Sequence, residues 1–104
     1  MKYDIDHYIK KFEDIPDDKW CMYQFICRDD QGSSVRYCAY GQCGAKNEID
    51  DSVEASALYS LTVNYFPRID VVNDNLSPLY TQDTPKLRIL AYLNDIKQGK
   101  LNKL

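Results

Sequence analysis

The first stretch with a clear apolar pattern covers residues 5–14. Its apolar side chains recur every three or four positions, the spacing that places them on one face of an α-helix. Asp4 precedes the stretch as a candidate cap, and Pro16 follows its end. We therefore predict a short amphipathic helix whose apolar face packs against the rest of the protein. That face consists of Ile5, Tyr8, Ile9 and Phe12.

A second helix is predicted over residues 50–66. Asp51 and Glu54 have the spacing of an N-cap and the third helical residue, as in a capping box, and Pro67 ends the pattern. Because the apolar positions again fall on one face, we expect this helix to be the central one. Its apolar stripe consists of Val53, Ala57, Leu58, Leu61 and Tyr65.

The third predicted helix begins at Thr84-Pro85 and ends at Gly99. Proline is favoured in the first turn of a helix because its fixed φ suits the helix and its missing N–H is not needed there. The side chains at helical spacing after it predict the face that packs against the core. They are Lys86, Ile89, Leu90, Leu93 and Ile96.

Two stretches between the first and second helices are rich in aromatic and β-forming residues. Residues 20–28 and 34–40 flank the sequence DDQGS, which has the composition of a hairpin turn. We predict an antiparallel hairpin that turns at Gln31-Gly32, so that the numbers of opposite residues sum to 63. Residues 68–72 are a candidate third strand.

These elements predict an α+β protein: a single globular domain over residues 1–104, with about three helices packed on a short antiparallel hairpin. The length of 104 residues suits one domain with one hydrophobic core. We expect Trp20, at the start of the hairpin, to pack between the first and last helices as a core anchor.

The composition is that of an ordinary soluble globular protein, with 44% hydrophobic and 28% charged residues. It excludes a largely disordered chain, and no apolar stretch approaches the roughly 20 residues of a membrane span. The charged start of the chain has no apolar signal region, so we expect a cytoplasmic protein with no membrane partner. Nine tyrosines are the one excess, and tyrosine is enriched at binding surfaces.

The net charge of −3 is unevenly distributed along the chain. Residues 86–104 carry five basic side chains and one acidic side chain. These charges are scattered around a helix, without the dense basic stripe or interleaved aromatic residues that nucleic-acid binding requires. The sequence therefore disfavours nucleic acid as a partner.

The four cysteines have the spacing C-x5-C-x10-C-x4-C. In an extended strand Cys21 and Cys27 would lie roughly 20 Å apart, since each residue adds about 3.3 Å. Zinc needs ligands that converge on bonds of about 2.3 Å, so this spacing disfavours a zinc site. We expect four reduced and mostly buried cysteines, no metal and no cofactor.

A catalytic site is not expected either. The tetrapeptide GQCG at residues 41–44 resembles the approach to the nucleophile of papain-like proteases, but Lys46 stands where the reactive cysteine would follow Cys43. The one histidine, His7, precedes every cysteine, so a Cys43–His7 pair requires the fold to bring them together. Three pairs of adjacent aspartates suit turns and helix caps better than acid–base catalysis. They lie at residues 17–18, 29–30 and 50–51.

The segment YCAYGQCG at residues 37–44 is predicted to be the exit of a buried strand. Glycine there allows the chain to turn with positive φ or to pass close to another backbone. The alternative is a ligand-facing loop, in which the Gly41–Gly44 turn cradles a phosphate together with Arg28 and Arg36 across the hairpin.

The order of several short motifs resembles a loose group of small uncharacterised bacterial and phage proteins. Those proteins share a W…G…CA-x-G…ND pattern, which matches Trp20, Gly32, the CA-x-G at residues 38–41 and the Asn73-Asp74 pair here. The chain departs from the pattern after Gly41, where the group usually continues with apolar residues. The resemblance implies an α+β globule in which the CA-x-G turn and the Asn-Asp loop lie close together, and it transfers no activity.

The leading functional prediction is a non-enzymatic binding protein, a phage or mobile-element accessory or inhibitor that acts by contact with a host protein. The alternative is a small-ligand or nucleotide binder that uses the Gly41–Gly44 turn and the Asn73-Asp74 loop. Asn73 and Asp74 themselves have two readings: they hold the backbone of their loop, or Asp74 stays open to take a donor group from a partner. The candidate binding residues are Arg36, Tyr40, Gly41, Gln42, Asn73 and Asp74.

Overall fold

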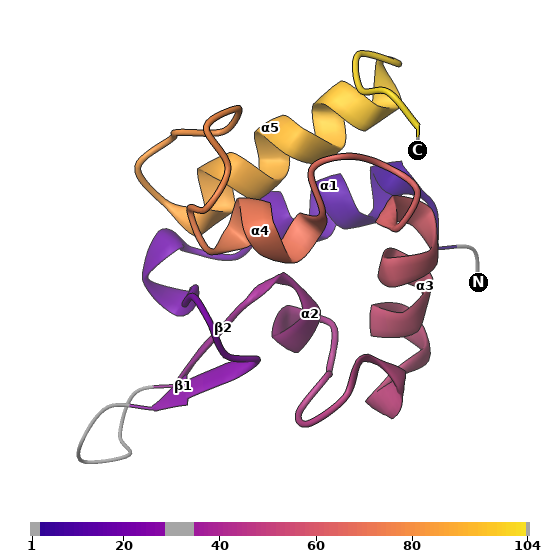
Figure 1. Ribbon diagram of the computed structural model, residues 1–104. Coiled ribbons are helices and arrows are strands. Elements are labelled where there is room, and N and C mark those ends of the chain that lie inside the picture. The colour runs from indigo at the N-terminus through magenta and orange to yellow at the C-terminus, as the bar shows by residue number, and fades with distance from the viewer. Residues whose placement is uncertain (1–2, 29–34, 104) are drawn as a thin grey trace.

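The computed structural model describes residues 3–28 and 35–103, and in those ranges it contains helices and one two-stranded antiparallel sheet (Figure 1). The α+β fold class is confirmed. The radius of gyration, 13.0 Å, is that of a single domain of about this length. The helices are α1 (Ile5–Glu13), η1 (Asp17–Lys19), α2 (Ala39–Gln42), η2 (Ile49–Asp51), α3 (Val53–Thr62), α4 (Ile69–Asn73) and α5 (Pro85–Lys97), and the strands are β1 (Ile26–Arg28) and β2 (Val35–Tyr37).

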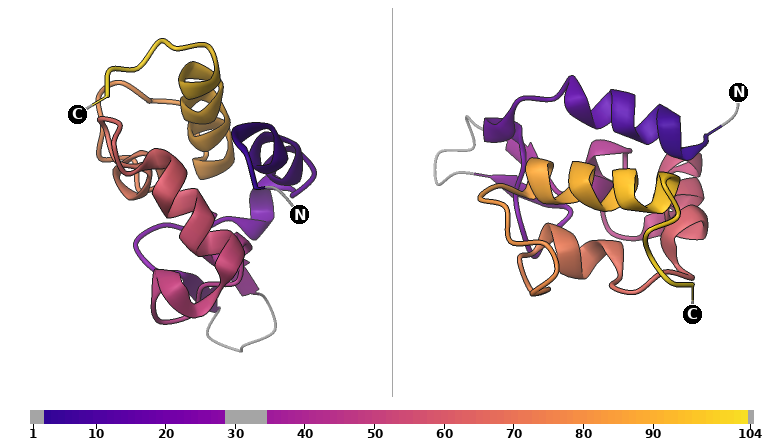
Figure 2. Two further views of the ribbon diagram at one scale, coloured as in Figure 1. Left: turned by 90° about the vertical axis from the view of Figure 1, so that its right-hand side faces the viewer. Right: turned by 90° about the horizontal axis from the view of Figure 1, so that it is seen from above.

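Helix α5 is the centre of the helical layer. It packs along α1 and also contacts α4, and Figure 2 shows α1 and α5 running side by side. The short helix α2 contacts α3, α4 and β2, so it joins this layer to the hairpin. The fully buried side chains of the layer are aromatic as well as aliphatic. They include Tyr8, Phe12, Val72, Ile89, Tyr92 and Leu93.

Helices α1 and α5 begin where the sequence predicts. The Asp4 carboxylate accepts a hydrogen bond from the His7 N–H at 2.9 Å. At the start of α5, the Thr84 hydroxyl oxygen accepts one from the Leu87 N–H at 3.2 Å, and proline occupies the first turn. Both caps satisfy N–H groups that have no partner inside their helices.

The predicted start of α3 is wrong by one residue, since Ser52 rather than Asp51 is its N-cap. The Asp51 carboxylate is occupied by the N–H groups of the preceding loop, at residues 46–48. Val53, which was expected on the apolar stripe, is 77% exposed, whereas Leu58 is fully buried. The packed face of α3 therefore begins after its first residue.

Residues 68–72 are not a third strand but belong largely to α4. Ile69 and Val72 are both buried, and their separation of three residues puts them on one face of a helix, where in a strand they would point to opposite faces. Packing on α5 thus overrides the β-branched composition of this segment.

The hairpin register is the predicted one, because Ile26 pairs with Tyr37 and Cys27 pairs with Arg36, both sums being 63. The predicted turn at Gln31-Gly32 lies outside the described residues. The strands are much shorter than expected, with three residues each.

The segment after β2 enters helix α2 at Ala39 instead of continuing as a strand. A Cβ on Gly41 would overlap the carbonyl oxygen of Phe25, and Gly44 has φ of 101°. The prediction that these glycines allow a close backbone approach and a positive-φ turn is confirmed.

Trp20 is a core residue, as predicted. Its side chain is 3% exposed, and its ring packs edge-on against Phe12 of α1 with 5.2 Å between centroids. None of the helices within residues 3–28 and 35–103 is long and apolar enough to cross a membrane.

Candidate functional site

A cavity of about 310 Å³ lies between residues 23–25, α2 and α4. We call it the Tyr23 cavity. Its walls combine aromatic side chains with two carboxylates and an amide, a composition typical of binding pockets. The lining residues are Tyr23, Gln24, Phe25, Cys38, Ala39, Tyr40, Ile69, Asp70, Asn73 and Asp74.

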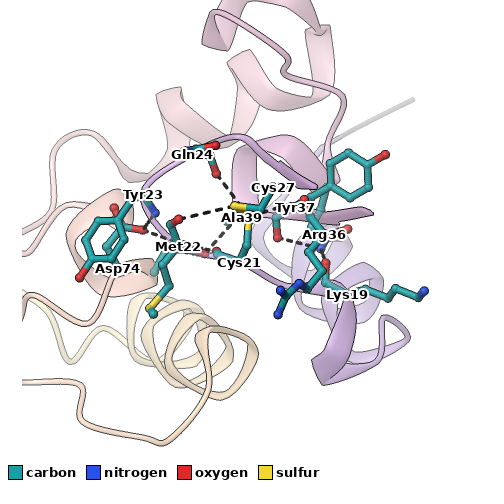
Figure 3. Close-up of a disulfide and its surroundings, with 12 residues drawn as sticks. Lys19, Cys21, Met22, Tyr23, Gln24, Cys27, Arg36, Tyr37, Ala39 and Asp74 are labelled. Carbon is teal, nitrogen blue, oxygen red and sulfur yellow. Dashed lines mark hydrogen bonds between the residues drawn. A yellow bond between two sulfur atoms is a disulfide. The ribbon is translucent and has the colours of Figure 1, made fainter. Parts of the chain in front are cut away.

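A disulfide between Cys21 and Cys27 closes the loop that supplies one wall of the cavity (Figure 3). The prediction of four free thiols is therefore wrong for these two residues. It assumed an extended strand, but Tyr23 has φ of 72°, a left-handed conformation that bends the chain back. The two Cα atoms lie 6.2 Å apart, within the usual range for a disulfide and far from the roughly 20 Å of an extended strand.

Asn73, at the end of α4, holds two separate segments of the chain. Its side-chain oxygen accepts a hydrogen bond from the Ala39 N–H at 3.1 Å, and its Nδ2 donates one to the Cys21 carbonyl at 2.9 Å. Asn73 is 2% exposed, so water does not compete for these bonds. Asn73 thus fixes the start of α2 and the start of the disulfide loop against α4, and the implied proximity of the CA-x-G turn and the Asn-Asp loop is confirmed.

Asp74 positions the exposed wall of the cavity. Its Oδ1 accepts hydrogen bonds from the Tyr23 N–H at 2.8 Å and from Nδ2 of Asn73 at 3.0 Å. Figure 3 shows this bond between Asp74 and the backbone of Tyr23 beside the disulfide. The structural reading of Asn73-Asp74 holds in a modified form, since the two side chains bind backbone groups of distant segments rather than of their own loop.

Arg88 supports the same region from α5. It is 2% exposed, and its guanidinium donates to the carbonyls of Val72 at 3.0 Å, Asn73 at 2.9 Å and Gln82 at 2.7 Å. The first two carbonyls belong to the last turn of α4, and the Val72 carbonyl also accepts a hydrogen bond from the Asn75 N–H at 3.3 Å. Arg88 therefore caps α4. It fixes the position of the end of this helix, where Asn73 and Asp74 contact the disulfide loop.

The aromatic walls differ in exposure. Tyr23 is 67% exposed, whereas Tyr40 is 7% exposed and packs edge-on against Phe25 with 6.2 Å between centroids. Burial, together with the neighbouring Asp70 carboxylate, raises the pKa of the Tyr40 phenol. The Tyr40 phenol on the inner wall therefore stays uncharged at neutral pH, and Tyr23 forms an accessible rim.

The predicted site residues do not all meet in one place. Tyr40, Asn73 and Asp74 line the Tyr23 cavity, but Gly41 and Gln42 line a separate groove beside the hairpin. Gln42 also connects α2 to the end of η1, since its Nε2 donates a hydrogen bond to the Lys19 carbonyl at 2.8 Å.

Arg36 lines neither the cavity nor the groove. It is exposed on β2, where it pairs with Cys27. The Gly41–Gly44 turn, Arg36 and Asp74 therefore do not form the single ligand site of the nucleotide-binding alternative.

The two remaining cysteines are buried thiols, as predicted. Cys38 is 8% exposed and Cys43 is 3% exposed. Burial raises the pKa of both thiols, and for Cys43 to about 12. His7, the one histidine, is bonded to the Glu54 carboxylate at 2.6 Å. A thiol that stays protonated is a poor nucleophile, so the structure offers no support for Cys43–His7 catalysis.

Four parts of the site were missed by sequence reasoning. Tyr23, Phe25 and Asp70 sit in segments that were predicted to be strands, and no local signal places them in one cavity. Arg88 had a signal that was overlooked: it is four residues before Tyr92 and eight before Ile96, which puts it on the buried face of α5. In the predicted stripe, Leu90 is half-buried and packs against the core, whereas the half-buried Lys86 is not part of the hydrophobic core.

Comparisons with protein-family models, with curated proteins and with solved structures find no match to this chain. Among the described residues, no three histidine, cysteine or acidic side chains converge to form a metal site. The case for function rests on the geometry of the Tyr23 cavity.

Proposed function

We propose that this protein is a non-enzymatic binding protein that acts by contact with another protein through the Tyr23 cavity and its rim. The observation that carries the proposal is an aromatic side chain, 67% exposed, that is fixed beside a cavity. The Tyr23 backbone is held by Asp74 at 2.8 Å and lies within the disulfide loop. Rigid aromatic residues next to pockets are the groups that contribute most to binding at protein interfaces.

The nucleotide-binding alternative has less support. No lysine or arginine is among the lining residues that the structure gives for the Tyr23 cavity, and two aspartates are. The groove at the Gly41–Gly44 turn has Arg28 and Lys46 but lacks the Asn73-Asp74 loop. Phosphate groups need positive charge or convergent N–H donors. The groove has the charge but not the Asn73-Asp74 loop that this alternative also requires, and the Tyr23 cavity has the loop but not the charge, so a protein partner has more support.

The resemblance to small bacterial and phage proteins favours a host protein as the partner and an accessory or inhibitory role. The cytoplasmic location stays a prediction, and the disulfide weighs against it, because such bonds persist mainly in oxidising compartments. Alkylating the thiols at cell lysis tests the location. A cytoplasmic pool predicts four blocked thiols on denaturation, whereas an oxidising compartment predicts two.

Affinity capture with a matched pair of variants tests the proposed function. Tyr23→Asn removes the aromatic rim but keeps a residue that tolerates the left-handed backbone. Val53→Ser removes an equally exposed apolar side chain from α3. We expect a partner captured by the wild type and by Val53→Ser to be lost or at least tenfold depleted with Tyr23→Asn. Equal capture by all three proteins would contradict the proposal.

A further inference from the structure

The Tyr23 cavity has an acidic and aromatic lining. Asp70 and Asp74 both line it, and its lining within the described residues includes no lysine or arginine. Tyr23, Phe25 and Tyr40 supply the aromatic surface. A cation is attracted both by carboxylates and by the negative face of an aromatic ring, so this combination selects for positive charge.

Both carboxylates can still accept a hydrogen bond from a ligand. Asp74 uses Oδ1 for the N–H of Tyr23 and for Asn73, while its Oδ2 accepts no hydrogen bond from the residues that the structure describes. Asp70 uses Oδ1 for the Val71 N–H at 3.0 Å.

Neither neighbouring basic side chain forms a buried ion pair with these carboxylates, although burial lowers the pKa of Arg88 and the nearby Asp74 charge opposes that shift. The Oδ2 of Asp70 faces Arg68 at 3.3 Å, but the side chains of this pair are 46% and 63% exposed. Exposed pairs of this kind are weak, so a ligand cation can replace the Arg68 guanidinium. The buried Arg88 directs its hydrogen bonds to backbone carbonyls and to the Met22 sulfur, and Asp74 is not among its partners.

The size of the cavity limits the ligand. At about 310 Å³ it lies at the lower end of the range of about 300–1,000 Å³ for small-molecule pockets. It therefore suits one long side chain. Arginine and lysine combine a long apolar stem, which can lie against the aromatic walls, with a charged end that can reach a carboxylate.

We infer that the Tyr23 cavity takes a cationic side chain, arginine or lysine, from the protein partner. This inference rests on the proposed function and adds the chemical class of the group that is recognised. In the complex, the stem of the cation lies along Tyr23 and Phe25, and its charged end meets Asp74 and Asp70.

Four small probes of similar size test this inference without a known partner. They are the N-acetyl methylamides of arginine, lysine, citrulline and glutamate, added to the oxidised full chain and followed by amide chemical shifts. Citrulline keeps the shape of arginine but is neutral. We expect the arginine and lysine probes to shift the amides of Tyr23, Ala39 and Asp74. Citrulline should bind about tenfold more weakly, the difference expected from one exposed ion pair and one cation–π contact, and glutamate should cause no shift.

Asp74→Asn provides the matched variant. The amide oxygen of the new side chain can still accept the Tyr23 N–H, so the cavity keeps its shape, while the charge is lost. We expect this variant to prefer arginine over citrulline by clearly less than tenfold, because Asp70 and the aromatic rings remain while one of the two carboxylates is lost. Asp83→Asn, an exposed position that does not line the cavity, should retain the tenfold difference.

Two results would overturn the inference. One is citrulline binding to the wild type as tightly as arginine, which would make the cavity an apolar site without charge selection. The other is the absence of shifts at the cavity with every probe. Neither result decides the proposed function, which is judged by capture with Tyr23→Asn.

Discussion

Replacing Arg88 tests the claim that one buried guanidinium holds the candidate site together. Arg88→Met keeps an unbranched apolar stem in the core of α5 but removes the donors to Val72 and Asn73. A buried carbonyl left without a donor, as that of Asn73 would be, costs about 1–3 kcal/mol, whereas the Val72 carbonyl would keep the Asn75 N–H at 3.3 Å. Part of this loss is offset because the variant no longer buries an ion. We expect a net decrease of about 1–3 kcal/mol in the free energy of unfolding, with a lower melting temperature.

Urea unfolding followed by the fluorescence of Trp20, the one tryptophan, measures this decrease, because the residue is 3% exposed in the folded state. Lys86→Met on the same helix is the control, and we expect it to stay within about 0.5 kcal/mol of the wild type. Arg88→Lys should fall between the two, since one ammonium group cannot reach three carbonyls in different directions. An Arg88→Met protein as stable as the Lys86→Met control would refute the role assigned to Arg88.

Three further predictions concern the cysteines, the acid stability and the glycine contact. Iodoacetamide should block no cysteine in the native protein, two cysteines after denaturation without a reductant, and four after denaturation with a reductant. The intact mass of the protein counts the blocked cysteines, and four blocked cysteines without a reductant would disprove the disulfide. The N–H groups of Asn47, Glu48 and Lys46 hold the pKa of Asp51 below its usual range. Its contribution to stability is therefore present above about pH 4 and is lost as the pH falls through the lowered pKa. Asp51→Asn should be less stable than the wild type at pH 7, and this difference should shrink as the pH is lowered below about 4; Asp18→Asn, at an exposed position, is the control at pH 7. Gly41→Ala should lower the free energy of unfolding by more than about 1 kcal/mol, because the added methyl group meets the Phe25 carbonyl, and an unchanged urea midpoint would contradict that contact.

The helices with strong local signals were predictable from the sequence. Asp4 and Thr84-Pro85 mark the starts of α1 and α5 through hydrogen bonds within three residues, and such local chemistry can be read from the sequence. The hairpin register was predictable for the same reason, since it depends on the position of one turn.

The candidate site was predictable only in part, because it depends on contacts between distant segments. Asn73 bonds to residues 34 and 52 positions away. Asp74 binds the N–H of Tyr23, where the chain turns back although the β-forming composition predicts a strand. The disulfide follows from that bend and could not be inferred from an extended geometry. Tyr40, Asn73 and Asp74 were identified as candidate binding residues, but the aromatic residues Tyr23 and Phe25 that complete the cavity were not.

Site-specific photocrosslinking from position 23 tests the central claim most directly. Tyr23 is replaced by the photoreactive p-benzoylphenylalanine, and in a parallel protein Val53 on α3 is replaced by the same residue. Both positions are exposed, at 67% and 77%, so they sample the surroundings equally well. Irradiation in the cells that naturally make the protein should give a discrete crosslinked partner from position 23 and none from position 53. A partner crosslinked only from position 53, or no adduct from position 23, would contradict the claim that the Tyr23 cavity is the contact surface.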